Sequence, residues 1–298
     1  MIFLDNFRFP TFEKEDNFLA DYFKNHPYSM NTVYPFKVLS VRGLYSLDFE
    51  EITVLYGGNG SGKSTALNAI ANKLGLTRNS AYNKGDFHNE YLEFCSYLQG
   101  EWDDDILELK DVAMLITSDD IFKYMLDTRQ KNGHVRAHRD RVVNEWFAAR
   151  NSRIMHIDFE TGDGVDELVK SQTARRQTRS QYLKENLGEV APSFSNGETG
   201  FMRFIKSILP DKLYLLDEPE NSLSCELQMK LAQYIEESAR YYGCQFIIAT
   251  HSPFLLAMER AKIYNLDGEP AAISKFWELP NMKLYHELFS RYDIYFKK

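Results

Sequence analysis

The sequence predicts an α/β fold in which a mostly parallel sheet is flanked by helices. After Asn196, the buried apolar runs LYLLD and QFIIAT stand on either side of a helical pattern from about Ser224 to Tyr242. Earlier in the chain, the strand pattern of residues 47–56 leads through a glycine cluster into a helical pattern that starts at Ser64 and stops at Gly75. Apolar strands that alternate with helices are typical of a parallel sheet covered on both faces.

Two further regions complete this prediction. Residues 36–42 and 47–56 alternate apolar with polar side chains, the pattern of paired strands, so we expect an antiparallel β part at the N-terminal end. Residues 76–110 lack a clean period, and a short apolar run, DVAMLIT, is then followed by the helical-looking IFKYMLDTRQ. We therefore expect an inserted, mostly helical lobe.

The chain is thus predicted to contain four segments. Residues 1–75 form the N-terminal β part and the first strand–loop–helix unit, 76–190 the inserted lobe, 191–270 the second half of the core, and 271–298 a C-terminal segment packed on that core. Aromatic side chains crowd the last segment, and core packing is the simpler explanation, with a partner-binding patch as the alternative. They are Phe276, Trp277, Tyr285, Phe289, Tyr292, Tyr295 and Phe296.

Composition narrows the possible functions. A chain of 298 residues with 44% hydrophobic content is long enough to bury a core. Its net charge of -8 argues against a protein that coats nucleic acid over its whole surface. Two basic runs, at 129–141 and 170–184, leave a local surface for nucleic acid or another anionic partner open, although solvated helix faces are the simpler explanation.

Cysteine usage and apolar runs indicate the compartment. The chain has only Cys95, Cys225 and Cys244, without a CxxC spacing, so neither a disulfide framework nor a zinc site is indicated. The N-terminus lacks a basic region and a cleavage site, and no apolar run approaches the roughly 18 residues of a membrane span. We expect a cytoplasmic protein that is not inserted in a membrane.

The strongest chemical signal is GGNGSGKS at residues 57–64, which matches the phosphate-binding pattern G-x-x-x-x-G-K-[ST] between a strand and a helix. Such a loop turns backbone N–H groups toward phosphates, and the helix N-terminus favours the anion. Lys63 would reach the β- and γ-phosphates, Ser64 would ligate Mg²⁺, and Thr65 would support the α-phosphate. The residues expected to bind the nucleotide here are Gly57, Gly58, Asn59, Gly60, Ser61, Gly62, Lys63, Ser64 and Thr65.

Two carboxylates and a histidine follow the later strands. LYLLD ends in Asp217, which we expect in the magnesium shell, and the next residue, Glu218, is the candidate catalytic base. His251 follows QFIIAT, from where its imidazole could contact the γ-phosphate or the attacking water. Each residue alone would more often be structural, but together with the glycine loop they predict Lys63, Glu218 and His251 as catalytic residues.

A weaker signal is SNGE at residues 195–198, which precedes an apolar helix. Its polar groups could form a second anion site at a helix N-terminus, although Ser-Asn-Gly is also a common turn. The residues concerned are Ser195, Asn196, Gly197 and Glu198.

The glycine loop, SNGE, LLDEP and ATHS in this order resemble the ABC ATPases, in which the segment at SNGE is the signature motif that contacts the ATP of the other subunit. Residues 34–75 and 190–298 are similar to the SMC and RecF-like group and to its compact bacterial branch of AAA family ATPases. The resemblance implies a P-loop NTPase fold of ABC type, ATP as the nucleotide, and a head-to-head homodimer. It also implies that residues 221–224 form a D-loop at the dimer seam.

The sequence departs from the family pattern in several places. The signature reads SNGE instead of SGGQ, the D-loop reads NSLS without an aspartate, and no glutamine follows DVAMLIT, where Asp119 is the candidate substitute near the metal. The spacing from Lys63 to Ser195 excludes the long coiled-coil arms of SMC proteins. Upstream, Tyr34 and Phe36 suggest a stacking position for the base.

The leading interpretation is an ATPase that switches as a homodimer and acts on DNA, RNA or a partner effector protein, with DNA maintenance or antiphage defence as the setting by analogy. One alternative is an ATP sensor with slow turnover that regulates an effector. Another is the nucleotide-binding subunit of a transporter, against which the N-terminal KVLSVRGL and the missing glutamine count.

Overall fold

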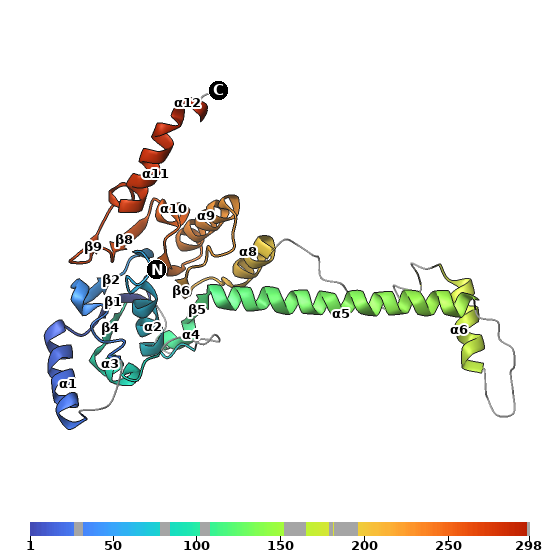
Figure 1. The fold of residues 1–298 in the computed structure, drawn as a ribbon, viewed down its shortest axis with the longest axis horizontal. Helices are drawn as coiled ribbons and strands as arrows, with labels where there is room; N and C mark the ends of the chain where they lie inside the picture. The colour runs from blue at the N-terminus through green and yellow to red at the C-terminus, as the bar shows by residue number, and fades with distance from the viewer. Residues whose placement is uncertain are drawn as a thin grey trace. The chain divides into compact units, whose positions relative to one another are not determined.

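The chain divides into two compact units. The computed structural model describes residues 1–26, 32–77, 84–101, 108–151, 165–178, 181 and 196–296. The main unit comprises Met1–Phe122 and Asn196–Lys298, and the inserted unit comprises Lys123–Ser195. Helix α5 (Ser118–Asn151) starts in the main unit and continues into the inserted unit, which also contains α6 (Val165–Arg176) (Figure 1).

A six-stranded sheet forms the centre of the main unit, in the order β5-β6-β7-β3-β8-β9. The first five strands in this order are parallel, and short β9 is antiparallel to β8. Their bounds are β3 (Ile52–Tyr56), β5 (Ala113–Thr117), β6 (Leu213–Asp217), β7 (Gln245–Thr250), β8 (Ala261–Asn265) and β9 (Ala272–Ile273). Every residue of β3, β6 and β7 is buried, as expected for parallel strands with helices on both faces. The predicted fold class is confirmed.

Helices cover this sheet. Helix α2 (Lys63–Lys73) packs on β6 and β7, and α9 (Cys225–Tyr241) packs on β7, α8 (Asn196–Ser207) and α10 (Pro253–Leu256). Ser224 caps α9 by accepting a hydrogen bond from the backbone N–H of Leu227, and Ser252 caps α10 in the same way. These caps fix where the two helices begin, which matters because the predicted site residues lie between the strands and these helices.

A second, antiparallel sheet has the order β2-β1-β4 and confirms the predicted antiparallel part. Its strands are β1 (Leu4–Arg8), β2 (Ser46–Asp48) and β4 (Ser96–Gln99), and helices α1 (Phe12–Asn25), α3 (His88–Phe94) and α4 (Leu109–Val112) complete this region. The buried amide of Gln245 on β7 accepts from the N–H groups of Phe3 and Leu4 and donates to the carbonyl of Leu4. One side chain thereby joins the two sheets.

The prediction of a strand at residues 36–42 is wrong. This stretch contains turns and the short 3-10 helix η1 (Ser40–Arg42), and β2 pairs with β1 instead. Lys37 has a φ of 63°, in the left-handed region, and its N–H donates to the carboxylate of Glu15 at 2.8 Å. The polar groups of this stretch are therefore bound by a side chain of α1, so they are not available to a strand ladder.

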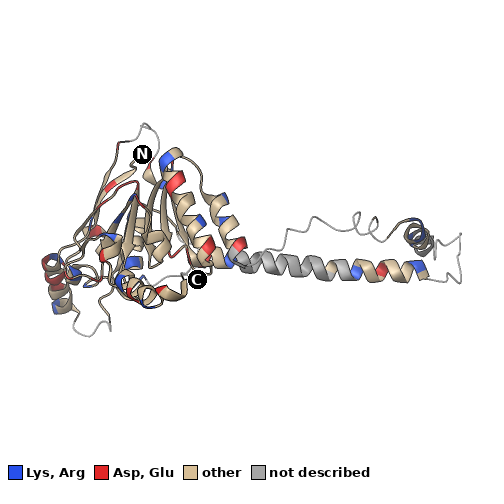
Figure 2. Ribbon diagram, turned by 90° about the horizontal axis from the view of Figure 1, so that it is seen from above, with Lys and Arg blue, Asp and Glu red and all other residues tan. Residues whose placement is uncertain are grey.

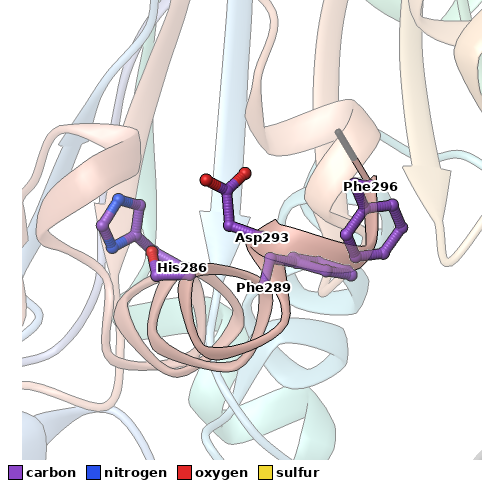
Figure 3. A pocket seen from close by; sticks show the side chains of 5 residues that line it. His286, Phe289, Asp293 and Phe296 are labelled. Carbon is purple, nitrogen blue, oxygen red and sulfur yellow. The ribbon is translucent and has the colours of Figure 1, made fainter. Parts of the chain in front are cut away.

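The aromatic C-terminal segment also differs from the expectation of core packing. It forms η2 (Phe276–Glu278), α11 (Pro280–Arg291) and α12 (Asp293–Phe296), and from Phe276 to Phe296 only Leu279 and Met282 are buried. Trp277 is 68% exposed and Phe296 is 70% exposed, because only the first turn of α11 meets the core. A hollow of about 590 Å³ between α11 and α12 is lined by His286, Phe289, Ser290, Asp293 and Phe296 (Figure 3).

The structure divides the chain at other points than residues 76 and 190. Strand β5 pairs with β6 in the large sheet, so the residues before Lys123 belong to the main unit. Acidic and basic residues are interspersed along the helices of the main unit (Figure 2). In the basic run at 170–184, Arg175 and Arg176 are exposed on α6. Most side chains of the run at 129–141 lie outside the described residues.

Within the described part, no helix has both the length and the apolar character that a membrane crossing needs.

Candidate nucleotide-binding site

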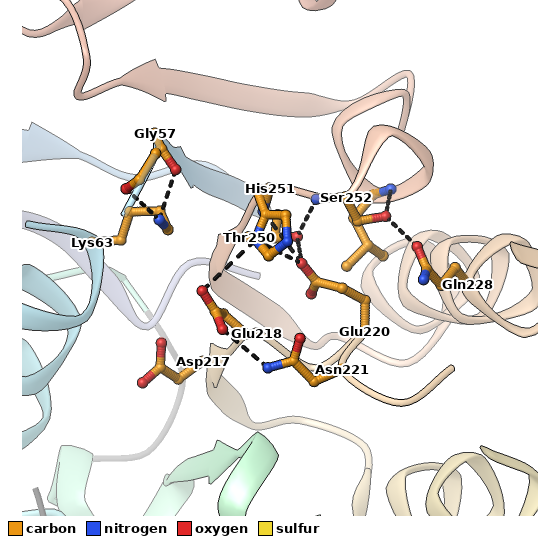
Figure 4. Close-up of polar contacts among 12 residues, drawn as sticks. Gly57, Lys63, Asp217, Glu218, Glu220, Asn221, Gln228, Thr250, His251 and Ser252 are labelled. Carbon is orange, nitrogen blue, oxygen red and sulfur yellow. Dashed lines mark hydrogen bonds and ion pairs between the residues drawn. The ribbon is translucent and has the colours of Figure 1, made fainter. Parts of the chain in front are cut away.

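Four parallel strands of the large sheet end at one edge. The register aligns Tyr56 of β3 with Thr250 of β7 and with Asn265 of β8, and Asp217 of β6 with Ala249 of β7. The residues that follow these strands therefore emerge side by side, where ligands of open α/β sheets bind. This edge brings the glycine loop, Asp217, Glu218 and His251 together, although they are far apart in the sequence (Figure 4).

The glycine loop connects β3 to α2, as predicted. Lys63, 6% exposed, donates from Nζ to the carbonyls of Gly57 at 2.7 Å and Gly58 at 3.0 Å, so its ammonium is folded back over the loop. A Cβ at Gly57 would overlap the side chain of Ser61. Gly62 has a φ of 96°, and a Cβ there would come within 2.7 Å of Leu39 Cδ2. Glycine is required at both positions, one for space and one also for backbone conformation.

The two halves of the predicted site meet at Ser64 and Asp217. Ser64 Oγ donates to Asp217 Oδ1 at 3.0 Å, from the first turn of α2 to the last residue of β6. A hydroxyl and a carboxylate are hard oxygen donors, the pair that Mg²⁺ takes while it keeps its waters and phosphate ligands. No group of three or more His, Cys, Asp or Glu side chains in the described part could hold a metal by itself. The donor set fits Mg²⁺ held jointly by protein and nucleotide.

Glu218 has an unusual backbone conformation. Its φ of 48° lies in the left-handed region, and its N–H donates to the carbonyl of Ala249 at 2.9 Å. Backbone strain of this kind clusters at functional sites because surrounding contacts must hold it. Glu218 Oε2 accepts from Asn221 Nδ2 at 3.0 Å, and Oε1 lies 3.7 Å from Nδ1 of His251. The contacts with Asn221 and His251 thus orient the carboxylate of Glu218. It is also partly exposed, as a candidate base must be.

His251 follows β7 and has a second acidic neighbour. Its side chain is 51% exposed, and Nδ1 lies 3.8 Å from Oε1 of Glu220. The same Glu220 oxygen accepts from the backbone N–H of His251 at 3.2 Å and from the hydroxyl of Thr250. Burial raises the pKa of Glu220, and its hydrogen bond with Thr250 opposes that rise. The predicted histidine is therefore held between two carboxylates (Figure 4).

The aromatic residues suggested for base stacking have different environments. The hydroxyl of Tyr34 lies 3.2 Å from Oγ1 of Thr65, so Tyr34 is close to the loop that would bind phosphates. Phe36 is only 1% exposed and packs among the aromatic rings of Phe18, Phe87 and Tyr91. Phe36 is therefore not available to stack on a base, because its ring is part of the core.

The remaining predicted residues are less well connected to the site. Ser195 lies outside the described residues, Asn196 and Gly197 begin α8, and Glu198 is exposed in its first turn. Asp119 is exposed in the first turn of α5, just after β5, whose last residue Thr117 is in register with Asp217. Their roles in binding ATP or metal remain predictions.

Two residues at this edge have no role in the motifs predicted from the sequence. Asp267 follows β8, and both of its carboxylate oxygens accept from the N–H of Gly58, at 2.9 and 3.0 Å. Glu220 stands three residues after β6 and holds the exit of β7. The sequence offers one signal for each residue. Asp267 belongs to an Asp-Gly turn after an apolar strand, and Glu220 is the second glutamate of DEPE. Only the strand register shows that both reach the nucleotide loop or the histidine.

Comparison with known proteins places the chain in a family. A family model described as "AAA domain, putative AbiEii toxin, Type IV TA system" matches residues 101–257, a range that contains Asp217, Glu218 and His251. It bears out the predicted resemblance to AAA family ATPases. No curated protein gives a match.

Solved structures also resemble the chain. One is described as "An inward-facing conformation of a putative metal-chelate type ABC transporter", with 18% identity, a TM-score of 0.35, and coverage of 79% of this chain and 76% of that one. Another is the Smc head domain of Pyrococcus furiosus with an extended coiled coil, bound to the C-terminal domain of ScpA. It shows 13% identity, a TM-score of 0.33, and coverage of 82% of this chain and 94% of that one.

Proposed function

This chain belongs to the AAA-domain family described as "AAA domain, putative AbiEii toxin, Type IV TA system", and we propose that it binds ATP with Mg²⁺ and hydrolyses it at the interface of a head-to-head homodimer. The closed dimer acts as a conformational switch on a nucleic acid or a partner effector protein. The proposal gives the family's P-loop ATPase character a specific reaction and a specific assembly.

The contact between Ser64 and Asp217 carries this proposal. The two residues are separated by 153 positions, yet their oxygens lie 3.0 Å apart at the edge where Lys63 and the glycine loop also stand. A chance pair of surface residues would not combine a phosphate loop, an acidic strand end and a helix N-terminus. The arrangement supports nucleoside triphosphate binding through its β- and γ-phosphates.

Hydrolysis assigns a separate task to each side chain. Lys63 exchanges its carbonyl partners for phosphate oxygens, and the N–H groups at the start of α2 hold the same anion. Glu218 accepts a hydrogen bond from the attacking water and aligns it with the γ-phosphate, while His251 contacts that phosphate. Ser64 and Asp217 would hold Mg²⁺, which would supply positive charge to offset that of the phosphates.

The dimer explains why the candidate base is linked to an exposed loop. Asn221 and Ser222 are exposed, and Asn221 donates to Glu218 at 3.0 Å. A second subunit seated on residues 221–224 would therefore act directly on Glu218. In the same dimer, the start of α8 would supply Ser195 to Glu198 to the ATP of the other subunit, so turnover requires association.

The biological role of the protein is proposed in broader terms than its reaction. The family description names a toxin–antitoxin system, which supports a role in antiphage defence or a related regulatory system inside the cytoplasm. The net charge of -8 makes a protein partner or a local nucleic-acid groove the fitting target, instead of binding to nucleic acid over the whole surface.

The test uses Glu218→Gln, which keeps the shape of the side chain and removes its charge. We expect an ATP- and Mg²⁺-dependent dimer by light scattering, with phosphate release lowered by about 10²- to 10⁴-fold. Glu226→Gln is the matched control, because Glu226 is exposed on α9 and pairs only with Lys230 among the described contacts. A Glu218→Gln protein that stays monomeric with ATP and turns over normally would refute both the shared site and the base. ATP-dependent dimers of a wild type without measurable turnover would instead favour an ATP sensor.

A further inference from the structure

Glu220 is a buried carboxylate at the candidate site. It lies three residues after β6 and is 4% exposed. Its Oε1 accepts from the hydroxyl of Thr250 and from the N–H of His251, so one oxygen holds two successive residues at the exit of β7. Thr250 is itself fully buried. The histidine backbone is thus anchored from β6, the strand that also carries Asp217.

The other carboxylate oxygen of Glu220 makes this arrangement unfavourable for the stability of the fold. Oε2 is buried and has no hydrogen-bond partner among the described residues. A buried charge that is only partly paired lowers stability, and a well-packed neutral side chain would generally be better for the fold. Burial accordingly raises the pKa of Glu220. A carboxylate kept under these conditions beside candidate catalytic residues points to a use in the reaction.

The imidazole of His251 lies with Nδ1 toward two carboxylates. Nδ1 lies 3.7 Å from Glu218 Oε1 and 3.8 Å from Glu220 Oε1, within ion-pair range but beyond a hydrogen bond. Because Nδ1 faces the two carboxylates, Nε2 lies on the opposite side of the ring. In histidines that act on a ligand, a carboxylate at one nitrogen sets the tautomer and the direction of the other nitrogen.

We propose that Glu220 is a positioning residue for ATP hydrolysis: it holds His251 with Nδ1 toward the carboxylates and Nε2 toward the γ-phosphate. The proposal depends on the ATPase function proposed above and adds a member to that site. Glu220 acts through His251 and touches neither the nucleotide nor the water. Ser252 supports the same strand exit by donating from Oγ to Gln228 at 2.7 Å.

The first measurement compares steady-state ATP hydrolysis by wild type, Glu220→Gln and Glu220→Asp. We expect Glu220→Gln to lower kcat by about 10- to 100-fold, the range found when a group that orients a metal-ligating histidine is removed, with KM nearly unchanged. Glu220→Asp keeps the charge and should recover part of kcat, and it remains informative should the glutamine variant fold poorly. Glu226→Gln serves as the exposed glutamate control.

The second measurement determines the tautomer of the His251 imidazole. Nitrogen-15 NMR of histidine-labelled protein reports which ring nitrogen carries the proton, and His251→Gln assigns the signal. We expect a proton on Nδ1 in wild type and a shifted tautomer balance in Glu220→Gln. An unchanged kcat and an unchanged His251 signal in Glu220→Gln would overturn the inference, while a loss of turnover in Glu218→Gln would leave the ATPase proposal standing. Normal turnover in Glu218→Gln would refute the ATPase proposal, and the NMR result would still decide whether Glu220 orients His251.

Discussion

Glu220 and Glu15 are buried carboxylates with similar bonding in different regions of the main unit. Glu220 accepts from a hydroxyl and a backbone N–H at the exit of β7. Glu15, on α1, accepts from the hydroxyl of Ser40 and from the N–H of Lys37. Both have one buried oxygen without a hydrogen-bond partner among the described residues, and burial raises the pKa of both. Their local chemistry alone does not separate a functional residue from a structural one.

What separates them is the element that each one holds. Glu15 fixes residues 37–40, which lead into η1 and the antiparallel sheet. Glu220 fixes Thr250 and His251 at the carboxyl edge of the large sheet, 3.8 Å from the imidazole. A buried carboxylate becomes a functional candidate through the group that it orients, and burial or a raised pKa only identifies where to look.

The largest expected difference between the two carboxylates is in turnover. Glu15→Gln should leave ATP hydrolysis close to that of wild type, whereas Glu220→Gln should lose about 10- to 100-fold. The reason is that the hydrogen bonds of Glu15 end on residues 37 and 40, while those of Glu220 end on His251. Phosphate release measured for both purified variants checks this. An equal loss in Glu15→Gln would remove the distinction between the two regions.

A smaller effect is expected when the hydroxyl partner of each carboxylate is removed. Ser40→Ala and Thr250→Val each leave a buried carboxylate with one hydrogen bond fewer, and each should lower the free energy of unfolding by about 1–2 kcal/mol. Only Thr250→Val should also lower turnover, because Thr250 precedes His251. Urea unfolding with parallel kinetics separates the two effects. Loss of activity in Ser40→Ala at full stability would contradict the comparison.

The smallest expected effect is a pH dependence of stability at Glu15. Burial raises the pKa of Glu15 above its ordinary value of 4.5, so the folded state binds this proton more tightly than the unfolded state. Its contribution to stability is complete below pH 4.5 and is lost as the pH rises through the folded pKa. Glu15→Gln does not titrate, so its stability relative to wild type should increase across that window, by about 1.4 kcal/mol per unit of pKa difference. Urea unfolding of both proteins at several pH values tests the sign, and a constant difference would contradict it.

The sequence predicted the centre of the fold better than its edges. The runs LYLLD and QFIIAT are β6 and β7, and the glycine loop joins β3 to α2 as expected. Residues 36–42 alternate like a strand but bind Glu15 of α1 instead. The C-terminal aromatics suggested core packing, yet Trp277 and Tyr295 are 68% and 66% exposed. Alternation and composition describe side chains, and they do not say which partner the backbone or the ring will find.

By itself, the sequence predicted which residues would carry the chemistry, because a phosphate loop and the acidic end of a buried strand are local patterns with one main physical use. The tertiary structure alone decided how they meet. Register between parallel strands placed Ser64 beside Asp217 and His251 between Glu218 and Glu220. It also brought Asp267 to the N–H of Gly58, a contact between residues separated by 209 positions. Such contacts depend on the order of the strands, which no short motif encodes.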